Sequence, residues 1–191
     1  MKRTLHVPTV RVRIRRWLAA GTLARWLVAA VGTFPLAVCS ATAERDLDER
    51  RGPEVEVQLP PFPQTEHLIP FVVSATTDNK FLIDSDSLTF VSGGLVRYTL
   101  VIISPSGAQN VSYEGMNCAT GERRLYALGR PDQTWSRARS DQWIRVRENT
   151  LNRHHAELFT NYFCPLGITV RDADEVRQAL RLGGHPAAMR R

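Results

Sequence analysis

The sequence predicts an α+β domain in which an antiparallel β-sheet, connected as a meander, is covered by two C-terminal helices and joined to them by one disulfide. Two changes along the chain of 191 residues support this prediction. Short apolar, β-branched runs separated by turn residues begin at residue 68, whereas apolar residues recur at helical spacing after residue 151. Strands that precede helices within one chain of this length are typical of a single α+β domain.

The first strands are expected to be short. Residues 68–74 form one apolar run, and residues 81–83 and 88–91 form two more. Asp84-Ser-Asp-Ser87 separates the last two runs and has the composition of a turn. Each run therefore predicts a separate strand.

The strongest strand prediction covers residues 95–104, which the Gly-containing turn at residue 107 follows. Its alternation predicts two faces: Val96, Tyr98, Leu100 and Ile102 on one, and Arg97 and Thr99 on the other. Residues 109–118 can return beside it, and residues 123–128 can add a further strand. Residues 135–147 show neither the alternation of a strand nor the spacing of a helix clearly, so their structure stays ambiguous.

Two helices are expected in the second half. The first runs from Leu151 to Cys164, with Asn149 or Thr150 as its N-cap and Pro165 as its end. The second begins after Asp172, which forms a capping-box pattern with Glu175, and it stops at Gly183.

Residues 1–43 are predicted to be a cleaved signal peptide. A basic region ends at Arg25, an apolar run of about thirteen residues follows, and Ala41-Thr-Ala43 supplies the pattern that signal peptidase requires. The apolar run is too short to span a bilayer, which needs about twenty residues. We therefore expect the mature chain to start at Glu44 and to contain no transmembrane segment.

Three other interpretations of the leader remain open. A lipoprotein would be modified at Cys39, but Val38 makes the preceding motif poor. Arg15-Arg16 resembles a twin-arginine signal but lies far upstream of the apolar run. A mitochondrial transit peptide would be amphipathic instead of having a compact apolar block.

The formal charge of +6 belongs to the leader. Residues 1–43 hold seven of the 25 basic side chains and no acidic one, so 18 basic side chains face 19 acidic ones in the remainder. A nearly neutral mature chain gives no support to nucleic-acid binding.

The mature chain divides into three parts by composition. Residues 44–64 are acidic and proline-rich, and they predict a disordered linker. Residues 65–182 form the domain, and residues 183–191 are expected to be a flexible tail. Cys118 and Cys164 remain after cleavage, and an even pair in an oxidising compartment predicts one bridge.

Several side chains are candidates for chemical sites. His154 and His155, with Glu157, could serve a metal-dependent hydrolase, but adjacent helical residues point about 100° apart, so a packed pair is favoured. Cys118 as a thiolate nucleophile is disfavoured by its expected bridge. Asp84 and Asp86 lack the further oxygen ligands of a calcium loop.

Residues 123–153 carry an excess of arginine that could bind an anionic surface. The cluster is Arg123, Arg124, Arg130, Arg137, Arg139, Arg145, Arg147 and Arg153, against Asp132, Asp141 and Glu148. A solvated face is the favoured interpretation, and an anion site is the alternative.

One set of segments resembles a known family. The segments are Val96-Arg-Tyr-Thr-Leu, Asn110-Val-Ser-Tyr-Glu-Gly115, Asn117-Cys118, Arg124-Leu-Tyr-Ala-Leu-Gly129 and Trp135. They resemble the CNP-one-like (cryptic neisserial protein) family, over about residues 65–180, and more weakly the surface-adhesin E type of domain. The resemblance implies an exported protein of the Gram-negative envelope and brings no catalytic residues with it.

The sequence therefore predicts an exported protein that acts as a non-enzymatic binding or assembly module. Its expected location is the periplasm, with association with the outer membrane as an alternative. A protein or envelope component is its expected partner, and no catalytic residue, metal or cofactor is assigned. The alternatives are an anion-binding protein that uses the arginines of residues 123–153, for lipid or polysaccharide, and a small metal-dependent hydrolase that uses His154 and His155.

Overall fold

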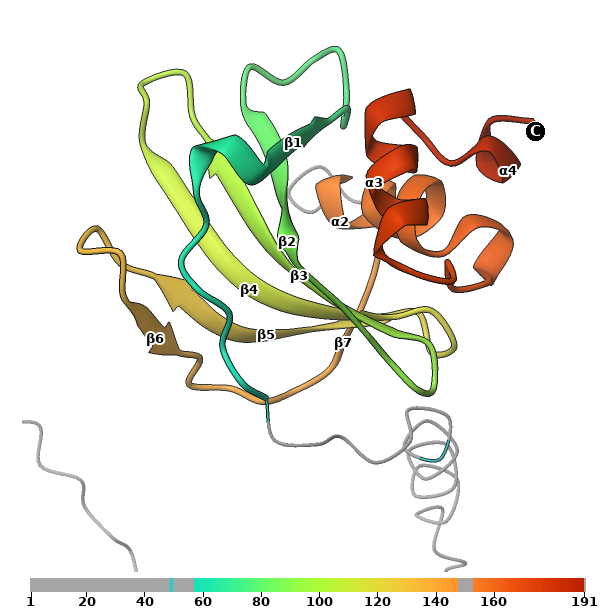
Figure 1. Cartoon of the computed structure of the whole chain (residues 1–191), viewed down its shortest axis with the longest axis horizontal. Coiled ribbons are helices and arrows are strands. Elements are labelled where there is room, and N and C mark those ends of the chain that lie inside the picture. Colours follow the sequence, from blue (N-terminus) through green and yellow to red (C-terminus); the bar gives the residue numbers. More distant parts are fainter. Residues whose placement is uncertain (1–48, 50–56, 148–152, 191) are drawn as a thin grey trace, which may run out of the picture. The chain divides into compact units, whose positions relative to one another are not determined.

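The central element of the computed structural model is an antiparallel sheet whose strands follow one another in chain order (Figure 1). The structure describes residue 49, residues 57–147 and residues 153–190. The strands are β1 (Leu68–Phe71), β2 (Lys80–Val91), β3 (Leu95–Ile103), β4 (Gln109–Asn117), β5 (Glu122–Gly129), β6 (Trp135–Arg137) and β7 (Ile144–Arg145). Both β6 and β7 pair with β5, at different positions along it. The predicted meander is confirmed.

Strand β2 corrects one detail of the prediction. The runs 81–83 and 88–91 belong to a single strand, interrupted by a bulge between Asp84 and Thr89. Ser87 closes this bulge, because its hydroxyl donates to the carbonyl of Asp84 (2.8 Å) and accepts from the backbone N–H of Thr99 (2.8 Å). A side chain that is typical of turns therefore bonds the backbone groups that the bulge leaves unpaired within a strand.

The helices follow the sheet in the chain and pack on one of its faces. They are α2 (Arg153–Glu157), the π-helical turn η2 (Leu158–Phe163), the short 3₁₀ turn η3 (Pro165–Gly167), α3 (Ala173–Leu182) and α4 (Pro186–Met189). Another 3₁₀ turn, η1 (Thr65–His67), lies directly before β1. The caps proposed at Asn149 and Thr150 lie outside the described residues. Asp172 accepts a hydrogen bond from the N–H of Glu175 (2.9 Å), and Gly183 ends α3 with φ of 75°, as predicted.

The main core lies between the sheet and these helices. Tyr98 on β3 packs against Phe163 of η2 with ring centroids 4.9 Å apart, and neither side chain is exposed. Cys118, directly after β4, is bonded to Cys164, directly after η2. The predicted bridge is confirmed, and it joins the sheet to the helical layer.

The opposite face of the sheet is also covered. Arg97, Thr99 and Val101, on the face of β3 that was expected to be the polar one, are all buried. A second cluster around Tyr113 and Tyr126 lies on this side. The central strands are therefore buried on both faces, which period-two alternation alone does not predict.

Residues 57–64 help to cover this second face. They belong to the segment predicted as a disordered linker, of which residues 44–48 and 50–56 are outside the described part. Phe62 contacts the ring of Trp135 (centroids 5.3 Å apart), and the indole N–H of Trp135 donates to the carbonyl of Pro60 (2.9 Å). Val57 and Leu59 pack against the second cluster as well. Three apolar side chains of residues 57–64, those of Val57, Leu59 and Phe62, therefore lie against an aromatic surface that becomes available only in the folded sheet.

Candidate functional site

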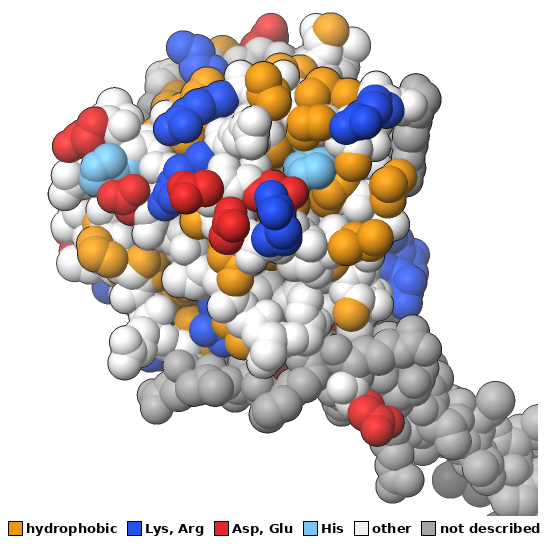
Figure 2. All heavy atoms as spheres, turned by 45° about the vertical axis from the view of Figure 1, so that its right-hand side comes forward, with side chains coloured by type: hydrophobic (Ala, Val, Ile, Leu, Met, Phe, Trp, Pro, Cys, Tyr) orange, Lys and Arg blue, Asp and Glu red, His pale blue; other side chains and the backbone are white. Residues whose placement is uncertain are grey.

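The arginines of residues 123–153 do not form one surface. Arg123 and Arg124 are consecutive on β5 and so point to opposite faces of the sheet. Arg124 and Arg97 flank the ring of Tyr126, at 5.4 and 5.5 Å from its centroid. Arg153, by contrast, lies on α2. On the face of the molecule that the C-terminal helices form, Figure 2 shows basic and acidic side chains interspersed.

His154 and His155 are both buried on α2, as the packed interpretation expected. Their ring centroids lie 4.0 Å apart, but the two rings have different surroundings. His154 stacks on Phe81 of β2 at 5.3 Å, whereas the Nε2 atom of His155 lies 2.7 Å from Oε2 of Glu114 on β4. Glu157 points elsewhere and accepts a hydrogen bond from the Asn161 side chain.

Glu114 is the acceptor at the centre of a buried polar network. Its Oε2 atom accepts from the hydroxyl of Tyr98 (3.0 Å) as well as from His155, and its Oε1 atom accepts from the hydroxyl of Ser112 (2.7 Å). Burial raises the pKa of Glu114, but the charge and hydrogen bond of His155, with the hydrogen bond from Ser112 and the charge of Arg123, outweigh it and lower the pKa to about 2. The carboxyl group is therefore ionised at every physiological pH.

The surroundings of His154 favour the uncharged form of its side chain, whereas those of Glu114 favour the charged form. Burial and the neighbouring His155 lower the pKa of His154 to about 4, so its ring is neutral at pH 7. No three His, Cys, Asp or Glu side chains come together as metal ligands within the described ranges. The geometry therefore gives the metal-dependent hydrolase no ligand set there, since the one carboxylate beside these histidines is already held by three donors.

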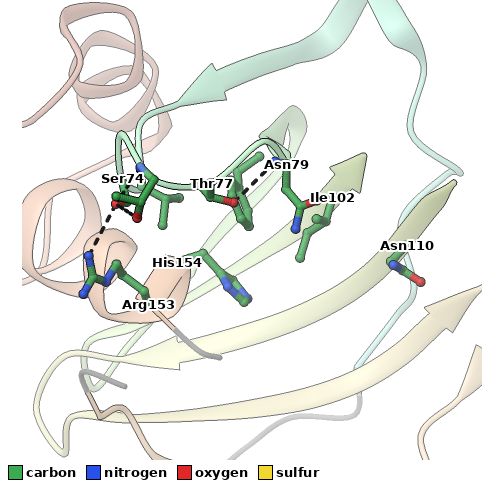
Figure 3. A pocket seen from close by; sticks show the side chains of 10 residues that line it. Ser74, Thr77, Asn79, Ile102, Asn110, Arg153 and His154 are labelled. Carbon is green, nitrogen blue, oxygen red and sulfur yellow. Dashed lines mark hydrogen bonds between the residues drawn. The ribbon is translucent and has the colours of Figure 1, made fainter. Parts of the chain in front are cut away.

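A hollow of about 470 Å³ opens between α2, the β1–β2 loop and the sheet (Figure 3). Figure 3 shows Ser74, Thr77 and Asn79 along the loop, with His154 and Arg153 of α2 facing them. We call this space the α2 hollow. Its lining residues are Val73, Ser74, Thr76, Thr77, Asn79, Phe81, Ile102, Asn110, Arg153 and His154.

A second hollow of about 340 Å³ adjoins the α2 hollow at His154. It shares Ile102, Asn110 and His154 with the α2 hollow, and it reaches the buried network through His155 and Glu114. Arg123 also lines it. The α2 hollow, whose lining is mostly neutral, therefore adjoins a hollow that contains the charged network.

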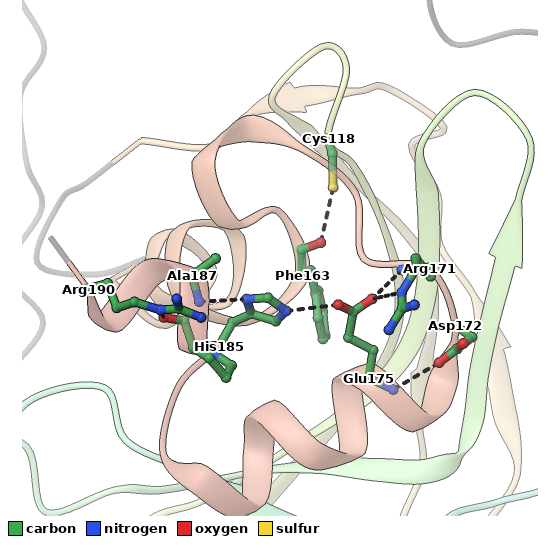
Figure 4. A network of polar contacts seen from close by, with 9 residues as sticks. Cys118, Phe163, Arg171, Asp172, Glu175, His185, Ala187 and Arg190 are labelled. Atoms are coloured by element: carbon green, nitrogen blue, oxygen red, sulfur yellow. Dashed lines mark hydrogen bonds and ion pairs between the residues drawn. The ribbon is translucent and has the colours of Figure 1, made fainter.

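A second polar network joins α3 to the residues that follow it (Figure 4). His185 Nε2 lies 3.0 Å from Oε1 of Glu175, and its Nδ1 atom accepts from the N–H of Ala187 (3.2 Å) at the start of α4. Burial raises the pKa of Glu175, but hydrogen bonds from Arg171 and His185 outweigh it, and the pKa lies below its ordinary value. His185, in the segment predicted as a flexible tail, therefore contacts both α3 and the start of α4. Residue 191 is outside the described part.

The remaining candidates have structural contacts. Cys118 is bonded to Cys164, so it carries no thiol. The Oδ1 atom of Asp84 accepts from the N–H of Asp86 (3.2 Å), and Oδ2 of Asp86 pairs with Nδ1 of His67 (3.2 Å). These carboxylates therefore stabilise the bulge of β2.

Sequence reasoning missed Glu114 and the β1–β2 loop as parts of a site. Glu114 lies within a strand, opposite Tyr98 in the register between β3 and β4. The signal that could have found it is the alternation of β4, which puts Ser112, Glu114 and Met116 on the face that meets the helices. The loop residues 74–79 carry no motif, and only folding brings them to α2.

Fold and site define a one-disulfide α+β domain in which C-terminal helices cover a meander sheet beside a mostly neutral hollow. The chain belongs to the CNP1-like family, whose model matches residues 48–181. This match confirms the resemblance carried by the strand segments. No curated protein and no solved structure matches the chain. No described helix combines the length and the apolar character that crossing a bilayer requires.

Proposed function

We propose that the protein is exported to the periplasm and acts there as a non-enzymatic binding module that holds its ligand in the α2 hollow. The observation that carries the proposal is the composition of this hollow. Hydroxyl and amide side chains line it together with the apolar Val73, Phe81 and Ile102. A volume of about 470 Å³ lies in the range of sites that enclose small molecules.

The rigidity of the surroundings supports a binding role for this hollow. Phe81 lies in β2, Ile102 in β3 and Asn110 in β4, so three hydrogen-bonded strands fix one wall. His154 stacks on Phe81 and fixes the position of α2 beside them. A preformed wall lowers the conformational entropy that a ligand must overcome.

Addition of a partner's strand to the sheet has less support. The edge strand β1 has four residues, among them Pro70, which lacks a backbone N–H to donate. The opposite edge, β6, has three residues. Such edges offer a partner few main-chain hydrogen bonds, so the hollow is the better candidate site.

Export is supported by the leader sequence and by the disulfide between Cys118 and Cys164, since disulfides persist mainly in oxidising compartments. N-terminal sequencing of the protein from periplasmic extract of its native host is expected to begin at Glu44. Recovery only from cytosol, with residues 1–43 attached, would refute export.

The binding role can be tested by filling the hollow. In the Asn79→Trp variant, an indole would occupy the hollow, whereas Ala75→Trp places the same side chain at an exposed position of the same loop that does not line it. We expect the native protein and Ala75→Trp to retain a small molecule from envelope extract in native mass spectrometry, and Asn79→Trp to lose it. Equal retention by all three, or retention by none, would refute binding in the hollow.

A further inference from the structure

The charge of the α2 hollow identifies the chemistry of a ligand. Among its ten lining residues, Arg153 is the one with a formal charge at pH 7. His154 is neutral there, because its pKa is about 4. The other lining side chains are hydroxyls, amides or apolar groups, so the hollow presents one positive charge among neutral hydrogen-bonding groups.

Arg153 has spare capacity to bind. Its guanidinium donates one long hydrogen bond, from Nη1 to the hydroxyl of Ser74 (3.4 Å), and Figure 3 shows the two side chains together at one end of the hollow. A guanidinium has five N–H donors in a planar fork that matches two oxygens of a carboxylate or phosphate. Arg153 makes no ion pair with any residue that the structure describes, so an incoming oxyanion would have no described carboxylate to displace.

The charged residues near the α2 hollow do not line it together with Arg153. In the adjacent hollow, Glu114 is bonded to His155 and is also within electrostatic reach of Arg123. Asp78 is exposed in the β1–β2 loop and does not line the α2 hollow, and Lys80 is exposed at the start of β2. Within the lining of the α2 hollow itself, Arg153 therefore supplies the positive charge that an anion would meet.

We infer that the ligand of the α2 hollow is a small organic oxyanion, a carboxylate or phosphate on a body that carries hydroxyl groups; this inference rests on the proposed function. Arg153 holds the oxyanion. Ser74, Thr77, Asn79 and Asn110 offer hydroxyl and amide groups to the body of the ligand, and the apolar wall packs against its carbon atoms. Such an anion exists as a free metabolite or as the headgroup of an anionic lipid, and both present the same chemistry.

The test uses the oxidised mature protein and five probes: glucose 6-phosphate, glucuronate, glucose, inorganic phosphate, and vesicles that contain phosphatidylglycerol. Binding is followed by NMR shifts of His154 and Asn110 for the soluble probes, and by cosedimentation for vesicles. We expect at least one oxyanion with a hydroxylated body to bind more tightly than glucose and than inorganic phosphate. Preference for the sugar anions identifies a free metabolite, and preference for vesicles identifies a headgroup; either result supports the inference.

The decisive variant is Arg153→Gln, which keeps hydrogen-bonding groups and removes the charge. Loss of a charge-assisted hydrogen bond is expected to weaken binding of the oxyanion about tenfold to a hundredfold. Arg153→Lys should restore part of the affinity, and Arg139→Gln, at an exposed site outside both hollows, should leave it unchanged. The inference would be overturned if neither a sugar anion nor the vesicles bound more tightly than glucose, or if Arg153→Gln had no effect on the oxyanion probe that binds.

Failure of this inference can be told apart from failure of the proposed function. A neutral molecule from envelope extract that Asn79→Trp excludes, and that Arg153→Gln still binds, leaves the hollow as the binding site and refutes the oxyanion. If Asn79→Trp excludes nothing, the hollow is not a binding site, and both proposals fall.

Discussion

The Nε2 atom of His155 lies 2.7 Å from Oε2 of Glu114, and both side chains are buried between α2 and β4. Because Glu114 is ionised, Nε2 must be the donor of this bond. The Nδ1 atom of His155 is buried and has no hydrogen-bond partner. The pair therefore links the first helix to the middle of the sheet through one charge-assisted bond, 41 residues apart in the chain.

Removal of the Glu114 charge is expected to destabilise the fold strongly. In Glu114→Gln, an amide N–H₂ would face donors from Tyr98, Ser112 or His155, and one partner of a buried pair would be lost. Such a loss typically lowers the free energy of unfolding by about 3–5 kcal/mol. Urea unfolding of the oxidised protein measures it. Glu66→Gln, at an exposed site, is the control, and a similar small effect of both variants would contradict the role of Glu114.

Acidification is expected to destabilise the protein in two steps. The pKa of His154 falls from 6.5 to about 4 on folding, so the unfolded chain binds more protons in this range and stability decreases as pH falls through it. The pKa of Glu114 falls from 4.5 to about 2, so the stability that its charge contributes is present above pH 4.5 and is lost toward pH 2.

The His154 step can be isolated by substitution. His154→Phe keeps an aromatic ring against Phe81 and removes the titrating group. Between pH 6.5 and 4, the free energy of unfolding of the native protein should fall by about 3 kcal/mol more than that of the variant. Parallel pH profiles of the two proteins in chemical denaturation would show that His154 is not held neutral by burial.

Loss of the disulfide is expected to lower stability without altering the α2 hollow, whose lining contains neither cysteine. The bridge spans 46 residues, and a loop of that length corresponds to about 4 kcal/mol in the chain-entropy model. Cys118→Ala/Cys164→Ala should unfold at correspondingly lower urea concentration, and a reducing agent should destabilise only the native protein. Equal sensitivity of both proteins to reductant would contradict a structural bridge.

Gly115 leaves the space that Tyr126 occupies on the second face of the sheet. A Cβ atom at this position would lie 2.6 Å from the Tyr126 hydroxyl and 2.8 Å from its Cε2 atom. Gly115→Ala should therefore move the ring from between Arg97 and Arg124, and it should destabilise the fold by about 1–3 kcal/mol.

A double-mutant cycle checks the cause. In a Tyr126→Leu background the added methyl group has more room, so Gly115→Ala should then cost less than it does alone. If the two substitutions were additive within about 0.5 kcal/mol, the close approach of Tyr126 to Gly115 would be refuted.

Local signals predicted those elements whose stabilising contacts are close in the chain. The end of α3 was predictable because Asp172 caps an N–H three residues away and Gly183 adopts the left-handed conformation. The strand β3 was predictable because alternating apolar residues fill it. By contrast, residues 57–64 and 183–190 were expected to be unstructured. Their contacts with Trp135 and Glu175 could not be predicted, because these partners are remote in sequence or belong to another element.

The sequence by itself determined the meander, the helical cover, the pairing of Cys118 with Cys164 and the resemblance to the family, since periodicity, turn chemistry and an even cysteine count are properties of short segments or of composition. Only the tertiary structure decided that Glu114 meets His155 and that Arg153 faces the β1–β2 loop across a hollow. The physical reason is that strand register and the position of α2 depend on packing of the whole core. A one-residue shift of β4 would turn Glu114 to the other face.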